Sequence, residues 1–257
     1  MTGLRVAVTG GSGVLGTALR DVRPRWAYLS RAECDVRDFR AVYRTFRSLA
    51  PDIVLHTAAL TDHAHPNAAE IIDTNVIGTQ IVTTECDRLS IPMVYTSTHY
   101  VYGGVCGNYA ESDAEAPIGA YAMSKLAGEM ACAILGGNDS LIVRGSWYTR
   151  ETRLDHWARK GALVDAWCSR EPVADAARKI VALVEAGVRG VVNIGGKRRS
   201  FRDILVDEGY VGFREIERKD LRSSAEGERS ELAYPFPADT SVNTAKFEAL
   251  GLDWRNV

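Results

Sequence analysis

Short apolar runs alternate with helical segments through about the first 145 residues of this 257-residue chain. Runs that are rich in apolar residues, and short enough to be buried strands, lie at 5–10, 26–30, 52–59, 91–98 and 140–146. Between them, one helical segment begins near Val14 and the others span 37–49, 68–89 and 120–135. Strands that alternate with helices predict right-handed crossovers and a parallel, doubly wound α/β sheet. In such a sheet, ligands bind beyond the carboxyl ends of the strands.

The alternation becomes less regular after Trp147. The remaining pattern predicts a helix at 170–187, a strand at 190–196, a short helix near Phe201, a polar loop at 221–231 and a last helix at 243–251. We therefore expect a main domain at 1–148 and a reduced substrate-binding region at 149–257. Within that region, a helix and a strand at about 172–196 should return to the main sheet.

The composition is that of an ordinary globular protein, with 46% hydrophobic and 25% charged residues. A net charge of −2 gives no basic field that would indicate nucleic acid or an anionic membrane as a partner. No apolar run reaches the eighteen or so residues of a membrane span, and the first residues do not resemble a signal peptide.

The cysteines are odd in number, five, and scattered, which argues against a disulfide framework and favours a reducing compartment. We therefore expect a cytoplasmic location. His63 and His65 are the nearest approach to a metal-binding pair, but no Cys, Asp or Glu lies beside them at ligand spacing. We expect no metal site.

A glycine-rich loop, TGGSGVLG at 9–16, follows the first strand and opens the first helix. Gly10 permits a tight turn, Gly13 lets the backbone approach a pyrophosphate, and Gly16 lets the helix pack closely on the strand. The free N–H groups at the start of the helix suit phosphate oxygens. The loop in this position predicts dinucleotide binding and a Rossmann fold.

The end of the second strand indicates which dinucleotide is bound. An acidic residue there binds the ribose of NAD, whereas an arginine accommodates the 2′-phosphate of NADP. Here Ser30 takes the place of the acid and Arg31 follows it, with Glu33 close by. The pattern favours NADP(H) and leaves NAD(H) as the alternative.

Tyr121 and Lys125 lie four residues apart in the segment YAMSK, so they share one face of the predicted helix. A lysine at that spacing can lower the pKa of a tyrosine that donates a proton. The pair is a weak signal alone, and the glycine loop strengthens it.

Several segments together resemble the extended short-chain dehydrogenase/reductase family, and within it the dTDP-4-dehydrorhamnose reductases. The resemblance is carried by TGGSGVLG, CDVRD, PDIVLHTAALT, NVIGT, YTSTHYVYGG, YAMSKLAGE, IVRGSWYT and PFPADTSVNTAKFEALG. It is dense up to Thr149 and returns from about Pro172 to Leu252.

The resemblance assigns roles to individual residues. Tyr121 would protonate a carbonyl oxygen, Lys125 would tune that acid and hold the nicotinamide ribose, and Thr98 would orient the carbonyl. Tyr100 and Trp147 would line the sugar. Asp35 and Val36 would lie along the adenine. The full cofactor set expected is Gly10, Ser12, Gly13, Val14, Leu15, Gly16, Ser30, Arg31, Asp35, Val36, Ala58, Ala59, Thr61, Asn75, Thr96, Tyr121 and Lys125.

The resemblance implies NADPH-dependent reduction of the C4 carbonyl of a nucleotide-linked 4-keto-6-deoxy sugar, by an enzyme that is a homodimer in many relatives. The chain also departs from the family pattern. It is shorter around 148–170, where relatives build part of the sugar pocket, His99 replaces an aspartate, and the segment DHAHPN at 62–67 is unusual. These departures concern the substrate more than the cofactor.

Three other functions use parts of the same pattern. A 4,6-dehydratase needs an acid pair directly after the active-site threonine, where this chain has His99 and Tyr100. A nucleotide-sugar epimerase shares the tyrosine and lysine but would be expected to hold NAD through an acid at the end of the second strand. A non-catalytic NADP-binding regulatory subunit would fit the shortened sugar region, but it has no need of Thr98, Tyr121 and Lys125 together.

Overall fold

The computed structural model describes residues 3–61, 67–135, 139–223 and 236–257. Its centre is a six-stranded sheet in which every pair of neighbouring strands is parallel, in the order β10-β5-β4-β3-β1-β2. The strands of this sheet are β1 (Val6–Thr9), β2 (Ala27–Leu29), β3 (Ile53–His56), β4 (Met93–Thr98), β5 (Leu141–Gly145) and β10 (Gly190–Asn193). The expected doubly wound α/β fold is confirmed.

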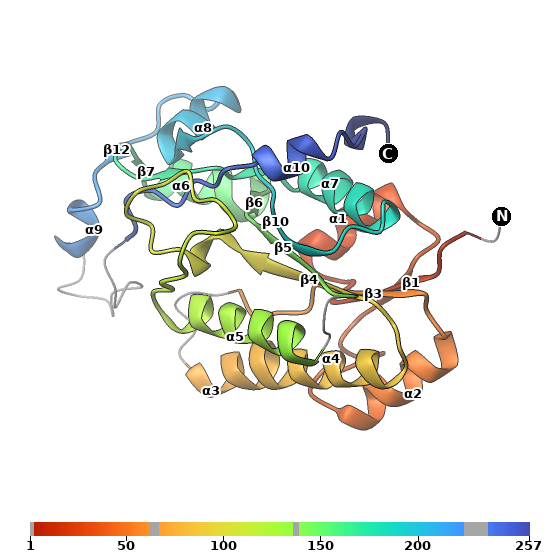
Figure 1. Cartoon of the computed structure of the whole chain (residues 1–257). Helices are drawn as coiled ribbons and strands as arrows, with labels where there is room; N and C mark the ends of the chain where they lie inside the picture. Colours follow the sequence, from red (N-terminus) through yellow and green to blue (C-terminus); the bar gives the residue numbers. More distant parts are fainter. Residues whose placement is uncertain (1–2, 62–66, 136–138, 224–235) are drawn as a thin grey trace.

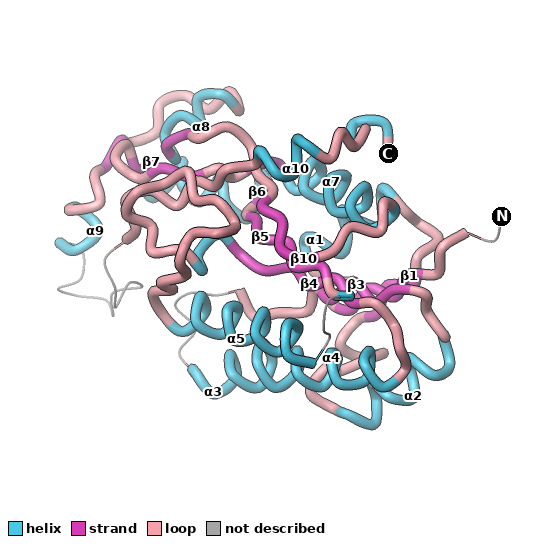
Figure 2. Tube along the Cα trace, viewed as in Figure 1, coloured by secondary structure: helices cyan, strands magenta, loops and turns pink. Residues whose placement is uncertain are grey.

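Helices cover both faces of the sheet, as Figures 1 and 2 show. One face carries α1 (Val14–Val22), α7 (Val173–Glu185) and α10 (Ala245–Ala249). The other face carries α2 (Phe39–Leu49), α3 (Ala68–Ile71), α4 (Gly78–Arg88) and α5 (Ala120–Leu135). The strand β10, which follows α7, pairs with β5 in this sheet.

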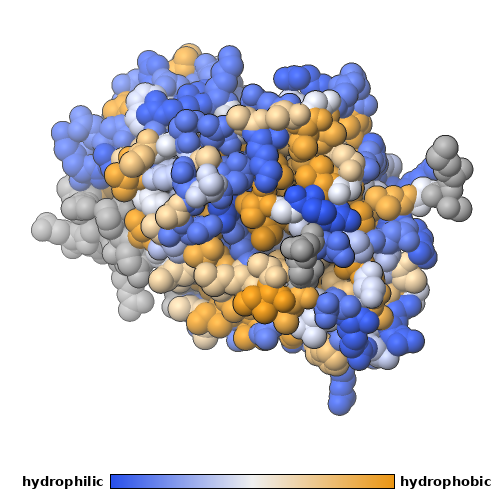
Figure 3. All heavy atoms as spheres, viewed as in Figure 1, coloured by the Kyte–Doolittle hydropathy of each residue, from blue (hydrophilic) through white to orange (hydrophobic). Residues whose placement is uncertain are grey.

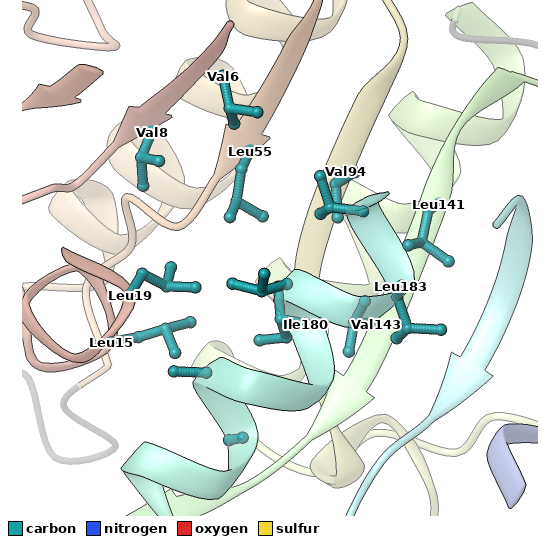
Figure 4. Packing of buried hydrophobic residues seen from close by; sticks show 14 of the residues in the cluster. Val6, Val8, Leu15, Leu19, Leu55, Val94, Leu141, Val143, Ile180 and Leu183 are labelled. Atoms are coloured by element: carbon teal, nitrogen blue, oxygen red, sulfur yellow. The ribbon is translucent and has the colours of Figure 1, made fainter. Parts of the chain in front are cut away.

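The core follows from the alternation of side chains along each strand. Val6 and Val8 of β1 face α1 and α7, whereas Ala7 between them faces the opposite helices. Figure 4 shows the first of these layers, in which Leu15 and Leu19 of α1 lie on the side of Ile180 of α7, and Leu183 of α7 lies beside Val143 of β5. Because both faces are covered, the strands are apolar almost throughout.

The segment predicted as one long helix at 68–89 contains a π-helix, Ile72–Ile77, between α3 and α4. The chain stays helical through all three elements. A π-turn inserts one extra residue and changes the direction in which the side chains of that turn point. The sequence pattern carried no signal for it.

The predicted helix at 170–187 begins later than expected. Pro172 has an extended backbone and caps α7, which starts at Val173. Before it, β9 (Glu171–Pro172) pairs with β6 (Trp147–Tyr148) in parallel. The missing N–H of Pro172 suits the end of a strand and the start of a helix, not a helix interior.

The rest of the C-terminal part surrounds a separate hydrophobic cluster that includes Tyr148, Leu163, Phe201 and Ile216. Its further elements are a π-helix (Arg150–Leu154), α6 (Asp155–Lys160), β7 (Ala162–Leu163), β8 (Trp167–Cys168), β11 (Arg199–Ser200), α8 (Phe201–Asp207), β12 (Glu215–Ile216) and α9 (Asp220–Ser223). The short strands form the pairs β11–β8 and β12–β7. The domain division at 148 and 149 stays a prediction.

Two predictions fall partly or wholly outside the described residues. His63 and His65 lie in the undescribed segment 62–66. The loop predicted at 221–231 starts with helical residues of α9 instead, and its remainder, from 224 on, is not described.

Candidate active site

The glycine loop makes a tight turn against the neighbouring strands. Gly10 has a φ of +72°, and a Cβ on it would lie 2.7 Å from the backbone of Ala58. A Cβ on Gly16 would lie 2.6 Å from the carbonyl oxygen of Gly10. Gly11, which was not singled out in the sequence, is equally confined, since its Cβ would meet Tyr28 at 2.7 Å. The turn therefore depends on the absence of side chains at these positions.

The start of α1 offers free backbone donors. Gly13 caps the helix in an extended conformation, and no side chain accepts a hydrogen bond from its first turn. Ser12, Gly13 and Val14 are exposed there, whereas Leu15 is buried in the core, so only its backbone can face a ligand. Exposed N–H groups at a helix start suit phosphate oxygens, so this cradle fits the pyrophosphate of a dinucleotide.

The end of β2 carries a carboxylate as well as an arginine. Glu33 accepts hydrogen bonds from the backbone N and the hydroxyl of Ser30, at 2.8 and 2.7 Å. These bonds hold the pKa of Glu33 below its usual value. Arg31 is exposed and lies 3.3 Å from Asp35. The carboxylate favours a ribose hydroxyl and the arginine favours a phosphate, so the geometry accommodates both dinucleotides.

The segment expected along the adenine borders an open depression of roughly 400 Å³. Asp35 lines it together with Arg37 and Asp73, whereas the side chain of Val36 is buried in the core. Arg37 makes a two-point contact with the carboxylate of Asp35, and this contact, helped by Arg31, holds the pKa of Asp35 well below its usual range although burial acts to raise it. Asp35 is therefore a fixed anion at this edge.

Asn75 lies in the π-helix and fastens two parts of the site together. Its amide exchanges hydrogen bonds with the backbone of Leu60, at 2.7 and 2.9 Å, and donates to Ser124 of α5 at 2.9 Å. The asparagine is fully buried, so it shapes the loop after β3 more than it contacts a ligand. A π-turn that places a buried polar group at a site is a recurrent functional feature.

Thr98 and Tyr121 meet at the carboxyl end of β4. Their side chains lie close enough to interact, although 22 positions lie between them in the sequence. Burial raises the pKa of Tyr121 to about 12, whereas the interaction with Thr98 and the charges of Arg170 and Arg153 act to lower it. The phenol is thus a neutral donor at physiological pH, placed beside a second hydroxyl.

Lys125, one helical turn after Tyr121, is buried, with its ammonium 4.1 Å from the ring centroid of Tyr95. Burial lowers the pKa of Lys125 to about 7, against the opposing influence of Cys132 and Glu129. In the structure, the cations that lower the pKa of Tyr121 most are Arg170 and Arg153. The tuning role expected of Lys125 stays a prediction.

Tyr100 and Trp147 lie near the same edge and are both partly buried. The hydroxyl of Tyr100 accepts a hydrogen bond from Arg170 at 3.0 Å, and the carbonyl of Trp147 accepts one at 3.4 Å. Trp147 also packs against the main core, so it has a structural contact besides any contact with a sugar.

The other expected cofactor residues divide into two groups. Ala58, Ala59 and Thr61 follow β3 at the edge and are at least partly exposed. Thr96 is buried, and its hydroxyl donates to the carbonyl of His56 at 3.0 Å. Its side chain is therefore engaged inside the sheet and does not face the edge.

Sequence reasoning missed a polar network behind the site. Glu129, one turn after Lys125, accepts hydrogen bonds from Ser97 of β4 and Arg144 of β5. Helical spacing in YAMSKLAGE places Glu129 on the same face as Lys125, which could have suggested it. Nothing in the sequence indicated Arg170.

In the described ranges, no group of three or more His, Cys, Asp or Glu could hold a metal ion.

Comparison with known proteins identifies the family. Residues 4–158 match the family described as RmlD substrate binding domain. A dTDP-4-dehydrorhamnose reductase of Mycobacterium tuberculosis is 35% identical over 211 residues, which cover 73% of this chain and 68% of that protein. A dTDP-4-keto-6-deoxy-D-glucose reductase of Streptomyces niveus is 32% identical over 204 residues, which cover 73% and 71%.

The fold has similar counterparts among solved structures. A dTDP-4-dehydrorhamnose reductase of Bacillus anthracis, solved in complex with NADP, superposes with a TM-score of 0.83 at 22% identity, covering 98% of this chain and 96% of the other. At that identity the likeness concerns the fold. With the family match over more than half of its residues, the chain belongs to the RmlD substrate binding domain family.

Proposed function

We propose that this protein reduces the C4 carbonyl of a nucleotide-linked 4-keto-6-deoxy sugar, with NADPH as the preferred reductant and NADH as the alternative. The observation that carries the proposal is the meeting of the Thr98 and Tyr121 side chains at the carboxyl end of β4. A neutral phenol beside a hydroxyl is suited to protonate and orient a carbonyl oxygen. Relatives over 30% identical are named as dTDP-sugar reductases, which supports this substrate class.

The roles proposed for individual residues follow from this arrangement. When bound, the reduced nicotinamide would supply the hydride to the carbonyl carbon. Tyr121 would give its proton to the carbonyl oxygen while Thr98 holds that oxygen by a hydrogen bond. Lys125 would approach the nicotinamide ribose, and Tyr100 and Trp147 would line the sugar. Asn75 would keep the loop after β3 and the start of α5 in register.

A substrate panel tests the proposal. The purified protein is incubated with NADPH and either dTDP-4-dehydrorhamnose or dTDP-4-keto-6-deoxy-D-glucose, and the product is identified by NMR. A 4-hydroxy sugar formed with one equivalent of NADPH consumed supports reduction. Interconversion of sugars without net consumption of NADPH would instead identify an epimerase, and tight binding without turnover would identify a regulatory subunit.

A second copy of this chain is the partner we propose besides the substrate. Met123, Met130 and Ile134 of α5 are 60%, 56% and 79% exposed, and Ile72 of the adjacent π-helix is 51% exposed. Figure 3 shows hydrophobic atoms gathered on the lower part of the view, where Figure 1 draws α4 and α5. Light scattering tests the homodimer, and Ile134→Glu should yield monomers.

None of the described helices combines the length and the apolar character needed to cross a membrane.

A further inference from the structure

Arg170 is a charged side chain in an unusually buried place. Only 6% of its surface is exposed, and its Nε lacks any hydrogen-bond partner. Its Cζ lies 5.7 Å from the ring centroid of Tyr100 and 5.8 Å from those of Trp157 and Phe201. Burying a cation is costly unless an anion or aromatic faces compensate for the lost water.

No carboxylate lies within ion-pair distance of Arg170 in the described part of the chain. The neighbouring acid, Glu171, has its carboxylate 2.5 Å from the ammonium of Lys179. Arg199, which lies close, adds a second positive charge and donates to the carbonyl of Arg170 at 3.2 Å. The guanidinium is therefore a cation held among rings without a fixed counter-ion.

The backbone holds Arg170 in this place from both sides. The pairing of β9 with β6 sets Glu171 beside Trp147, and the N–H of Glu171 donates to the carbonyl of Ser146 at 3.2 Å. On the other side, Ser169 accepts from Gly196 at 2.9 Å. A Cβ on Gly195 would lie 2.7 Å from the carbonyl of Ser169, so this strand crossing leaves little room to move.

The guanidinium points toward the residues of the proposed reaction. It donates to the hydroxyl of Tyr100 at 3.0 Å, and the backbone N of Tyr100 donates to the hydroxyl of Thr98 at 3.3 Å. Thr98 in turn interacts with Tyr121. Arg170 interacts electrostatically with Tyr100, Cys168 and Tyr121, and Arg199 contacts its carbonyl. Tyr121 interacts with Thr98, Tyr100, Arg153 and Arg170.

We propose that Arg170 is a positioning residue for proton transfer: its buried guanidinium stabilises the phenolate that Tyr121 becomes when it gives its proton to the substrate oxygen. This inference rests on the proposed reduction. In that step, the carbonyl carbon gains a hydride, the oxygen gains the proton of Tyr121, and the phenol is left with one negative charge until solvent returns a proton. Arg170 is a buried positive charge that can stabilise it.

The test measures the phenol directly, without sugar or cofactor. The protein is labelled with 3-fluorotyrosine, whose phenol is more acidic than that of tyrosine, and titrated by ¹⁹F NMR. The resonance of position 121 is assigned with Tyr121→Phe. Arg170→Met removes the positive charge and should raise the titration midpoint of position 121 by about one pH unit. Arg170→Lys keeps the charge and should shift the midpoint by less than half as much.

Two further variants make the result decisive. Arg170→Gln is a second neutral side chain that can still donate to Tyr100, should Arg170→Met fail to fold. Arg198→Met removes a half-exposed cation from the same segment, one that pairs with Asp239, and should leave the midpoint unchanged. An unchanged midpoint in the neutral variants at position 170, or an equal shift in Arg198→Met, overturns the proposal.

Kinetics provide the second readout. In the neutral variants kcat should fall about tenfold, with the affinity for NADPH unchanged. Because the titration needs no substrate, failure of the proposed reaction and failure of the role of Arg170 give different results. If the midpoint of position 121 rises as expected but the protein turns over no keto sugar, the proposed reaction is rejected and the role of Arg170 is retained.

Discussion

The carboxylate of Glu129 on α5 and the guanidinium of Arg144 on β5 form a buried ion pair, with Oε2 and Nη2 2.6 Å apart. Ser97 of β4 donates to the same carboxylate, and Tyr102 accepts from Arg144 at 2.9 Å. Glu129 is one helical turn beyond Lys125. The carboxylate therefore ties the helix that carries Tyr121 to β5 through Arg144, and to the strand that carries Thr98 through Ser97.

We expect Glu129→Gln to destabilise the protein by about 3 kcal/mol, because it leaves Arg144 with a single, partly exposed carboxylate partner, Glu115. Glu185→Gln is the matched control, since it breaks the half-exposed pair with Arg23 and should cost less than about 1 kcal/mol. Urea denaturation measures both variants. Equal losses of unfolding free energy in the two variants would contradict a larger contribution of the buried pair.

A buried neutral histidine makes the fold sensitive to acid. His56 lies between the hydroxyls of Thr9 and Thr79, at 2.6 and 3.0 Å, and burial, followed by the charge of Lys125, lowers its pKa to about 3. Between about pH 6.5 and 3 the unfolded chain binds a proton that the folded protein does not. Stability is therefore full above about pH 6.5 and declines as the pH falls toward 3.

The contribution of His56 is at most about 1.4 kcal/mol per pH unit in that window. His56→Gln should reduce the slope of unfolding free energy against pH by this amount, whatever its effect on stability at pH 7. The comparison isolates the histidine from acidic residues with lowered pKa, which give slopes of the same sign. A slope identical to that of the unaltered protein would show that His56 is protonated in the folded state.

The carboxylate at the end of β2 should govern the choice of dinucleotide. Glu33→Gln removes the negative charge of the carboxylate that accepts hydrogen bonds from Ser30. This carboxylate lies near the position expected for a 2′-phosphate. We expect the affinity for NADPH to rise about fivefold relative to that for NADH, the equivalent of ~1 kcal/mol. Fluorescence titration measures both dissociation constants. Glu217→Gln, at an exposed position elsewhere, is the control, and a ratio unchanged from the unaltered protein would refute the assignment.

The glycine loop should tolerate no side chain at its first turn. Gly10→Ala combines a φ of +72° with a Cβ only 2.7 Å from Ala58. Gly187→Ala is a matched control, with a φ of +66° and no atom within 4 Å of the added Cβ. The free energy of unfolding of Gly187→Ala should fall by about 1 kcal/mol from backbone strain alone. Gly10→Ala should lose more, and its affinity for NADPH should fall too. Equal losses in thermal denaturation, with equal dinucleotide affinity, would mean that the close approach is unimportant.

The elements with a strong periodic pattern could be predicted from the sequence. Apolar residues at helical spacing predict a helix at 37–49, and the structure has α2 there, Phe39–Leu49. The helix expected at 120–135 is α5, with the same bounds. The fold and the family are confirmed as well. The residue roles at Thr98, Tyr121 and Lys125 remain predictions.

What could not be predicted depends on contacts between distant segments. The two-residue strands β6 and β9 exist only because Trp147 and Glu171 meet in space, so no local pattern signals them. Arg170 was placed in a helix on the basis of local spacing, yet it precedes that pairing. Its position beside Tyr100 follows from the tertiary structure, as does the π-helix that turns Asn75 inward.

The most direct test of the proposed reduction is NADPH consumption with dTDP-4-dehydrorhamnose, compared between the unaltered protein and Tyr121→Phe. The ring of phenylalanine fills the same space, but it has no proton to give and no hydroxyl to interact with Thr98. We predict turnover by the unaltered protein and a loss of at least about a hundredfold in kcat for the variant, with NADPH affinity retained. Normal turnover by Tyr121→Phe would contradict the role of the tyrosine.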